Sequence, residues 1–185
     1  MGFKNIQIKD QQLHCSLLNL RQHKKIQMNK YIKIVVMIVT CLAAAYFWNQ
    51  IADYGLQTWY ETITKPSFAP PKEIFAPVWG FFFVLIGLGG GLFYAEIERT
   101  PEPVRKGMLF FWIQLALALL WAYLFFSLKN PLLATIEIAL TWLIAYETYV
   151  QFGKIKKFSA VLFIPYLLWL AFVTALSATI WFINS

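Results

Sequence analysis

Five long apolar runs constrain the fold of this 185-residue chain more than any other feature. They lie at approximately residues 34–52, 77–95, 108–128, 132–152 and 158–183. As a helix, even the shortest run covers about 28 Å, close to the ~30 Å hydrocarbon thickness of a bilayer. Because a backbone in lipid must satisfy its own hydrogen bonds, the runs predict an all-α integral membrane protein, a five-transmembrane-helix bundle.

The composition excludes several classes of function. Hydrophobic residues make up 59% of the chain and charged residues 14%, whereas soluble domains average about 45–50% and about 25%. The two Cys residues make no disulfide scaffold or zinc pattern, and both His residues (His14, His23) lie in the N-terminal tail, so we expect no metal site. Motifs for hydrolases, kinases or dehydrogenases are absent from the sequence, and no cofactor is expected.

Basic residues concentrate at the N-terminus. Residues 1–33 hold seven Lys or Arg residues against Asp10 alone, and no nucleic-acid-binding motif follows, so we expect no nucleic-acid partner. We predict a disordered basic tail over 1–33 and a membrane domain over 34–185. Met28 would be an ordinary start, so residues 1–27 are either a disordered tail or translation from a wrong upstream start.

The loop charges predict an orientation. With the N-terminus in the cytoplasm, the tail and the loops 96–107 and 153–157 place 13 of the 16 basic residues inside. This positive-inside bias puts the C-terminus outside and suits the cell (inner) membrane. The first run, with Lys30, Lys33 and a possible cleavage site at 43–45, also fits a signal peptide, although its continuation through Ala52 favours a retained span.

The 53–76 connection is rich in proline and aromatic residues. Pro66, Pro70 and Pro71 withhold amide donors and impose a bent path, while Trp59 and Tyr60 suit a membrane interface. The segment reads as a lid over the bundle or as an interfacial anchor.

Aromatic residues recur at helical spacing within three spans and predict three apolar faces. These faces are Trp79, Phe82, Phe83, Ile86 and Gly90; Gln114, Ala118, Trp121 and Phe125; and Tyr166, Trp169, Val173, Leu176 and Ile180. Converging faces would make a cavity for a planar hydrophobic ligand, whereas ordinary helix packing or lipid contact explains such stripes as well.

Three further features stand out within the spans. Glu137 and Glu147 lie within the fourth span, where an ionised carboxylate costs free energy, and they are therefore functional candidates. Gly87 and Gly91 permit a close helix approach, with intrachain packing favoured over a homodimer. Pro165 predicts a kink in the fifth span.

Several segments, in order and spacing, resemble the translocator protein family, also called TspO/MBR or tryptophan-rich sensory proteins. They are Trp59-Tyr60, Lys65–Pro71, Pro77–Gly80, Gln114–Leu117, Trp121 with Phe125-Phe126, and Pro165–Phe172. The resemblance covers about residues 34–185. It implies a retained first helix and an outer lid, and a pocket for porphyrin or haem.

The resemblance also implies site residues. Carried over by position, ligand binding involves Tyr60, Pro70, Trp79, Trp121, Glu137, Trp169 and Val173, and the lid involves Trp59, Lys65, Pro66 and Pro71. Val173 stands where the family usually has Ala. The animal sterol motif is missing at Ala178 and Phe182.

The resemblance implies a membrane tetrapyrrole-binding translocator or sensory protein, with protoporphyrin or haem and membrane lipid as partners. One alternative is light- and oxygen-dependent porphyrin degradation with Trp79 and Trp169 as redox partners, although the sequence offers no acid–base pair for turnover. Another is a carrier of lipid or another hydrophobic solute.

Overall fold

The computed structural model describes residues 29–185, and in that part the chain forms helices and no strand. The membrane-length elements are α2 (Lys30–Gln57), α4 (Lys72–Tyr94), α5 (Pro101–Ala122) with the π-helix η1 (Tyr123–Ser127), α6 (Pro131–Ile155), and α7 (Lys157–Val161) with α8 (Ile164–Asn184). These five spans confirm the predicted fold class and make the chain an integral multi-pass membrane protein. The predicted tail lies outside the described residues as far as residue 28, and so does the alternative start at Met28.

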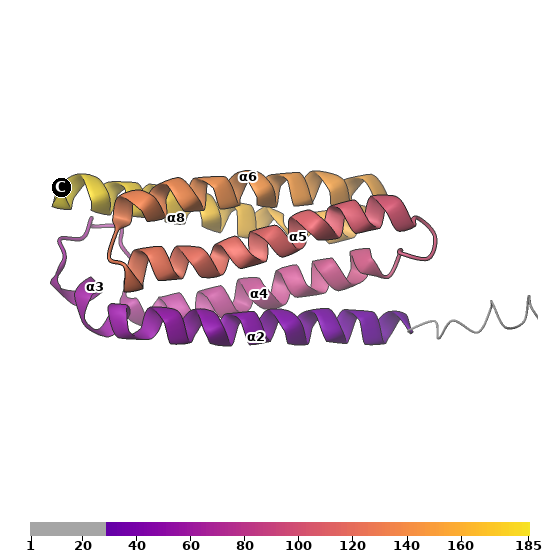
Figure 1. Ribbon diagram of the computed structural model, residues 1–185, viewed down its shortest axis with the longest axis horizontal. Helices are drawn as coiled ribbons and strands as arrows, with labels where there is room; N and C mark the ends of the chain where they lie inside the picture. The colour runs from indigo at the N-terminus through magenta and orange to yellow at the C-terminus, as the bar shows by residue number, and fades with distance from the viewer. Residues whose placement is uncertain (1–28) are drawn as a thin grey trace, which may run out of the picture.

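The spans lie roughly parallel, with α2 beside α4 and α6 beside both α5 and α8 (Figure 1). Glycines bring α2 and α4 together: a Cβ on Gly91 would lie 2.6 Å from Ile34 Cα, and one on Gly87 would lie 3.1 Å from Ile38 Cα. The prediction that this glycine pair serves intrachain packing is therefore confirmed.

The fifth span is broken where Pro165 predicts a kink. α7 ends at Val161 and α8 begins at Ile164, with Pro165 in its first turn. Proline has no amide hydrogen to give the Val161 carbonyl, so a continuous helix would lose that bond.

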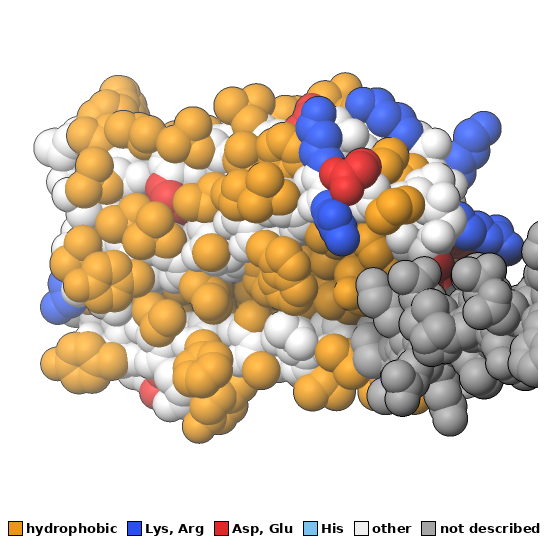
Figure 2. Space-filling model, turned by 45° about the vertical axis from the view of Figure 1, so that its right-hand side comes forward, with side chains coloured by type: hydrophobic (Ala, Val, Ile, Leu, Met, Phe, Trp, Pro, Cys, Tyr) orange, Lys and Arg blue, Asp and Glu red, His pale blue; other side chains and the backbone are white. Residues whose placement is uncertain are grey.

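Charged pairs close the end of the bundle at which α2 begins. Lys33 is buried and donates to Glu98 at 2.7 Å, while Lys156 donates to Glu96 at 2.9 Å. The Lys156 hydrogen bond holds the pKa of Glu96 below its usual value. Figure 2 shows Lys and Arg gathered at this end and apolar side chains over the flank, as a membrane-spanning bundle requires.

Helix boundaries at the opposite end differ from the predicted 53–76 connection. α2 continues to Gln57 and a short α3 (Trp59–Thr62) follows, so the irregular segment is confined to residues 63–71. The polar residues from Asp53 onward end the apolar run without ending the helix, because helical hydrogen bonding needs no lipid. The prolines then prevent α3 from continuing into α4.

The C-terminus fastens this segment to the bundle. Asn184, at the end of α8, accepts from the Thr64 amide at 3.0 Å and donates to the Thr64 carbonyl at 2.9 Å. Lys72 forms an ion pair with Glu61 at 2.7 Å. Residues 58–71 therefore lie across the end of the bundle that also carries the C-terminus, in the place expected of a lid (Figure 1).

Candidate functional site

Tryptophans from three spans meet in the bundle interior. Trp48 of α2 stacks on Trp79 of α4 and Trp121 of α5, with ring centroids 5.2 and 6.3 Å away, and the latter two lie 5.6 Å apart. All three are fully buried. Such spacings are those of rings in direct contact. The predicted faces of α4 and α5 therefore converge, and they do so as a packed ring cluster.

Trp169 of α8 adds a fourth indole at the edge of this cluster. It meets Trp79 edge-to-face at 6.3 Å and stacks between Phe82 at 5.7 Å and Phe172 at 5.3 Å. Unlike the other three, Trp169 is only half-buried. We call Trp48, Trp79, Trp121 and Trp169 the indole cluster.

The indole N–H groups of the cluster have no hydrogen-bond partner among the described residues, although each nitrogen is buried. A buried donor left unpaired costs roughly 1–3 kcal/mol, so native proteins rarely retain one without a reason. By contrast, Trp142 on α6 donates to the Leu167 carbonyl at 3.0 Å. The cluster thus holds hydrogen-bond donors that could meet acceptor atoms of a ligand.

The lid residues surround a second feature, a cavity of about 410 Å³ between the 63–71 segment and the start of α4. Its lining includes Tyr60, Lys65, Pro66, Pro70 and Pro71. The Tyr60 hydroxyl donates to the Pro70 carbonyl at 3.4 Å, and burial raises the pKa of Tyr60 to about 12. Lys65 donates to the Tyr60 carbonyl at 2.8 Å and lies over its ring.

Two chains of ring contacts join the lid to the indole cluster. In the first, Tyr60 contacts Phe126 of η1 at 6.2 Å, and Phe126 contacts Trp121 at 5.6 Å. In the second, Phe68 of the lid contacts Phe172 at 6.2 Å, which stacks on Trp169. Residues 58–71 are therefore linked to the indole cluster by continuous ring contacts.

The π-helix η1 carries the phenylalanine of the first series of ring contacts. Phe125 and Phe126 of the π-helix both lie in the core, where Trp59 packs against Phe125 at 5.4 Å. Gly55 of α2 lies directly against Phe126, since a Cβ there would fall 2.7 Å from Phe126 Cβ. π-bulges of this kind are frequent at functional sites.

The remaining expected site residues lie on α6 and α8. Glu137 is buried and accepts from Thr141 at 2.7 Å, while its second carboxyl oxygen has no partner among the described residues. Val173 is fully buried on the α8 face predicted from its spacing. Glu147, the other intramembrane acid, is half-buried and hydrogen-bonded to Gln151 one turn away.

Sequence reasoning missed Trp48 and the π-helix. Trp48 lies in one stripe with Met37, Cys41, Ala44 and Ala52, all buried. That helical spacing was the available signal. It was masked because the opposite side of α2 is equally apolar, with Val35, Val39 and Leu42 among its exposed residues.

Comparison with known proteins gives consistent similarities. The model of the TspO/MBR family matches residues 32–182. A tryptophan-rich protein TspO of Chlorobaculum tepidum is 32% identical over 161 residues, covering 85% of this chain and 99% of that protein. A tryptophan-rich protein TspO of Archaeoglobus fulgidus is also 32% identical, covering 83% of this chain and 98% of its own. The translocator protein of Sus scrofa is 32% identical over 66% of this chain and 73% of its own.

Proposed function

Since this chain belongs to the TspO/MBR family, we propose that it is a membrane translocator or sensory protein that binds a porphyrin or haem at the indole cluster beneath the lid. The observation that carries the proposal is the set of buried indole N–H groups without a partner among residues 29–185. Porphyrins offer a flat apolar face for the rings and carboxylates for such donors. No resident cofactor is part of the proposal.

The ring contacts support one position for the proposed ligand. The rings of Trp48, Trp79 and Trp121 already touch one another, so a planar ligand cannot enter between them without parting them. Trp169 is half-buried and connects through Phe172 to the lid. We therefore place the ligand beside Trp169, below residues 58–71, where the Trp169 N–H has no partner among residues 29–185.

Titration of the purified protein with protoporphyrin, followed by tryptophan quenching and porphyrin absorbance, tests the site. We expect Trp169→Ala and Trp79→Ala each to weaken affinity about tenfold or more, the equivalent of at least ~1.4 kcal/mol. The matched control is Trp142→Phe, since Trp142 is also half-buried but its N–H is already bonded to α8. Unchanged affinity in both alanine variants would overturn the placement.

Binding, transport and degradation require separate assays. Movement of protoporphyrin into sealed proteoliposomes would assign a translocator role. Loss of bound porphyrin under illumination in oxygen, faster than that of free porphyrin and abolished in Trp79→Phe and Trp169→Phe, would assign degradation. Affinity without either activity would leave a sensory or regulatory role.

We further propose that the end at which α2 begins faces the cytoplasm of the cell (inner) membrane. The support is the gathering of Lys and Arg at that end (Figure 2). Reporter fusions at Ser185 test this: a phosphatase fusion should be active and a fluorescent-protein fusion dark. As for a homodimer, it would need a face other than the Gly87–Gly91 pair, which α2 occupies.

A further inference from the structure

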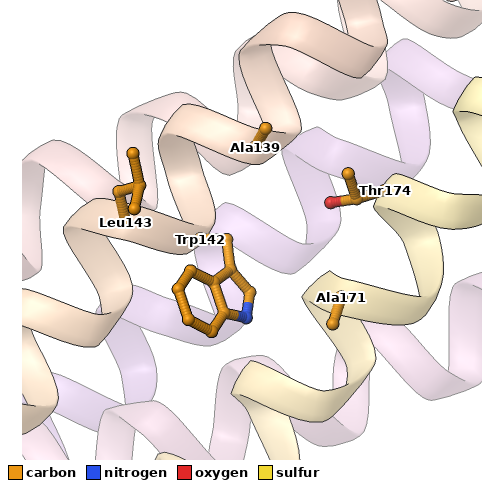
Figure 3. Close-up of a pocket in the computed structure, with 5 residues that line it drawn as sticks. All are labelled: Ala139, Trp142, Leu143, Ala171 and Thr174. Carbon is orange, nitrogen blue, oxygen red and sulfur yellow. The ribbon is translucent and has the colours of Figure 1, made fainter.

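A second hollow lies on the flank of the bundle, between α6 and α8 and apart from the indole cluster. It measures about 350 Å³, within the range of small-molecule pockets. Its lining is Ala139, Trp142 and Leu143 from α6 with Ala171 and Thr174 from α8 (Figure 3). Small side chains create the space, while the Trp142 indole forms a flat wall.

This groove lies at the middle of the membrane. Leu143 is twelve residues from either end of α6, which is about 18 Å along the helix axis. Ala171 lies at the corresponding depth, near the middle of the span from Lys157 to Asn184. Leu143 and Ala171 are exposed, so the groove opens sideways. At this depth the surroundings are hydrocarbon.

The polar atoms of the lining are already engaged. The Trp142 N–H donates to the Leu167 carbonyl at 3.0 Å, and the Thr174 hydroxyl donates to the Leu170 carbonyl at 2.8 Å. The groove therefore offers a ligand methyl groups, aliphatic carbon and one ring face, with no free donor. A headgroup, a carboxylate or a sterol hydroxyl would find no donor here.

We propose that this groove holds the acyl chain of a bilayer phospholipid as a preferred site, distinct from the general lipid contact along the other helices. Its depth selects a chain over a headgroup, and its lateral opening admits a molecule already dissolved in the bilayer. The lining extends about one helical turn along each helix, the length of a short stretch of one acyl chain. A chain packed there gains dispersion contacts on several sides instead of one.

The test uses phosphatidylcholine with a diazirine at the middle of one acyl chain, reconstituted with the protein in nanodiscs. After illumination, peptide mass spectrometry locates the adducts. We expect them to concentrate on residues 139–143 and 171–174, above the level on other exposed mid-span positions. Ala171→Phe and Ala139→Phe fill the groove and should each reduce this labelling several-fold.

Ala116→Phe is the matched control, because Ala116 is an exposed mid-span alanine on α5 outside the groove. It should leave the labelling unchanged, and near-UV circular dichroism checks that each variant keeps its ring packing. Even labelling of all exposed faces, or undiminished labelling in both filled variants, would overturn the proposal. So would preferential capture of a photoreactive sterol, or a cross-linked dimer lost in Ala171→Phe with no lipid adduct.

Discussion

Replacing Gly55 by alanine tests whether the close approach of α2 to the π-helix holds the lid-side core together. The added Cβ would lie 2.7 Å from Phe126 Cβ and 2.8 Å from its carbonyl carbon, whereas carbon atoms prefer about 3.5–4.0 Å. The shortfall of about 1 Å falls on atoms close to or within the backbone, which cannot rotate away. Overpacking of this kind costs typically 1–3 kcal/mol.

Gly80→Ala supplies the matched comparison. Gly80 also lies inside a helix, but a Cβ there meets nothing within 4 Å. Both substitutions gain about 0.5–1 kcal/mol from helix propensity, so the difference between the variants isolates the clash. At roughly 2–4 °C per kcal/mol for a chain of this size, Gly55→Ala should melt about 2–12 °C below Gly80→Ala.

The assay is thermal unfolding in detergent, followed by near-UV circular dichroism of the indoles. Phe126 packs against both Tyr60 and Trp121, so the Gly55 variant should also bind protoporphyrin more weakly. Equal melting temperatures for the two variants would refute the claim that α2 and η1 are in close contact at Gly55.

Three further predictions concern the ends of the bundle. Asn184→Ala removes both hydrogen bonds to Thr64, each worth about 0.5–1.5 kcal/mol, and limited proteolysis should then cut residues 63–71 faster. Glu96 has a lowered pKa, so its pair with Lys156 stabilises the fold above pH 4.5, and this stabilisation is lost as the pH falls through that lowered pKa. On acidification, Glu96→Gln should therefore lose less free energy of unfolding than the wild type, by up to about 1 kcal/mol. Tyr60 has a raised pKa, so between pH 10 and about 12 only the unfolded chain ionises it; stability should fall over that range, and less in Tyr60→Phe by alkaline melting.

Each of these has its own control. Ser185 lies beside Asn184, and its hydroxyl donates to the Phe182 carbonyl of the preceding helix. Ser185→Ala should therefore leave the proteolysis of residues 63–71 unchanged. Glu102→Gln breaks an exposed pair with Arg105 and should not alter acid unfolding as Glu96→Gln does. For Tyr60, identical alkaline melting of the wild type and Tyr60→Phe would contradict the assigned pKa. For Asn184, a proteolysis rate that Asn184→Ala leaves unchanged would contradict the proposed role of its hydrogen bonds to Thr64.

Hydropathy predicted the spans because the bilayer thickness sets their length, and the cost of unpaired backbone groups in lipid requires each of them to be helical. The helix ends were less predictable. The Asn29 side chain caps the start of α2 at Lys30, and the buried Lys33 pairs with Glu98, a partner 65 residues away. Interactions of that range leave no local signal in a sequence.

The candidate site likewise has features that the sequence predicts and features that it does not. Spacing found the buried faces that carry Trp79 and Trp121, since the bulky residues recur at helical intervals. It could not show that these rings would contact one another, because that depends on how α4 and α5 are placed in the bundle, which leaves no local signal in the sequence. It also could not foresee the π-helix at Tyr123–Ser127, which carries the buried residues Phe125 and Phe126.

If the proposed site is correct, the closed ring cluster predicts that hydrogen bonding contributes more than stacking to the choice of ligand. A ligand that parted Trp48, Trp79 and Trp121 would exchange ring–ring contacts for ring–ligand contacts of similar energy, with little net gain. The indole N–H groups are different, because they have no partner among residues 29–185 and an acceptor from a ligand would satisfy them. Protoporphyrin should therefore bind more tightly than its dimethyl ester, and Trp169→Phe, which keeps a ring and removes the donor, should reduce that preference. Equal affinity for the acid and the ester in the wild type would refute selection of a charged carboxylate by the indole N–H groups.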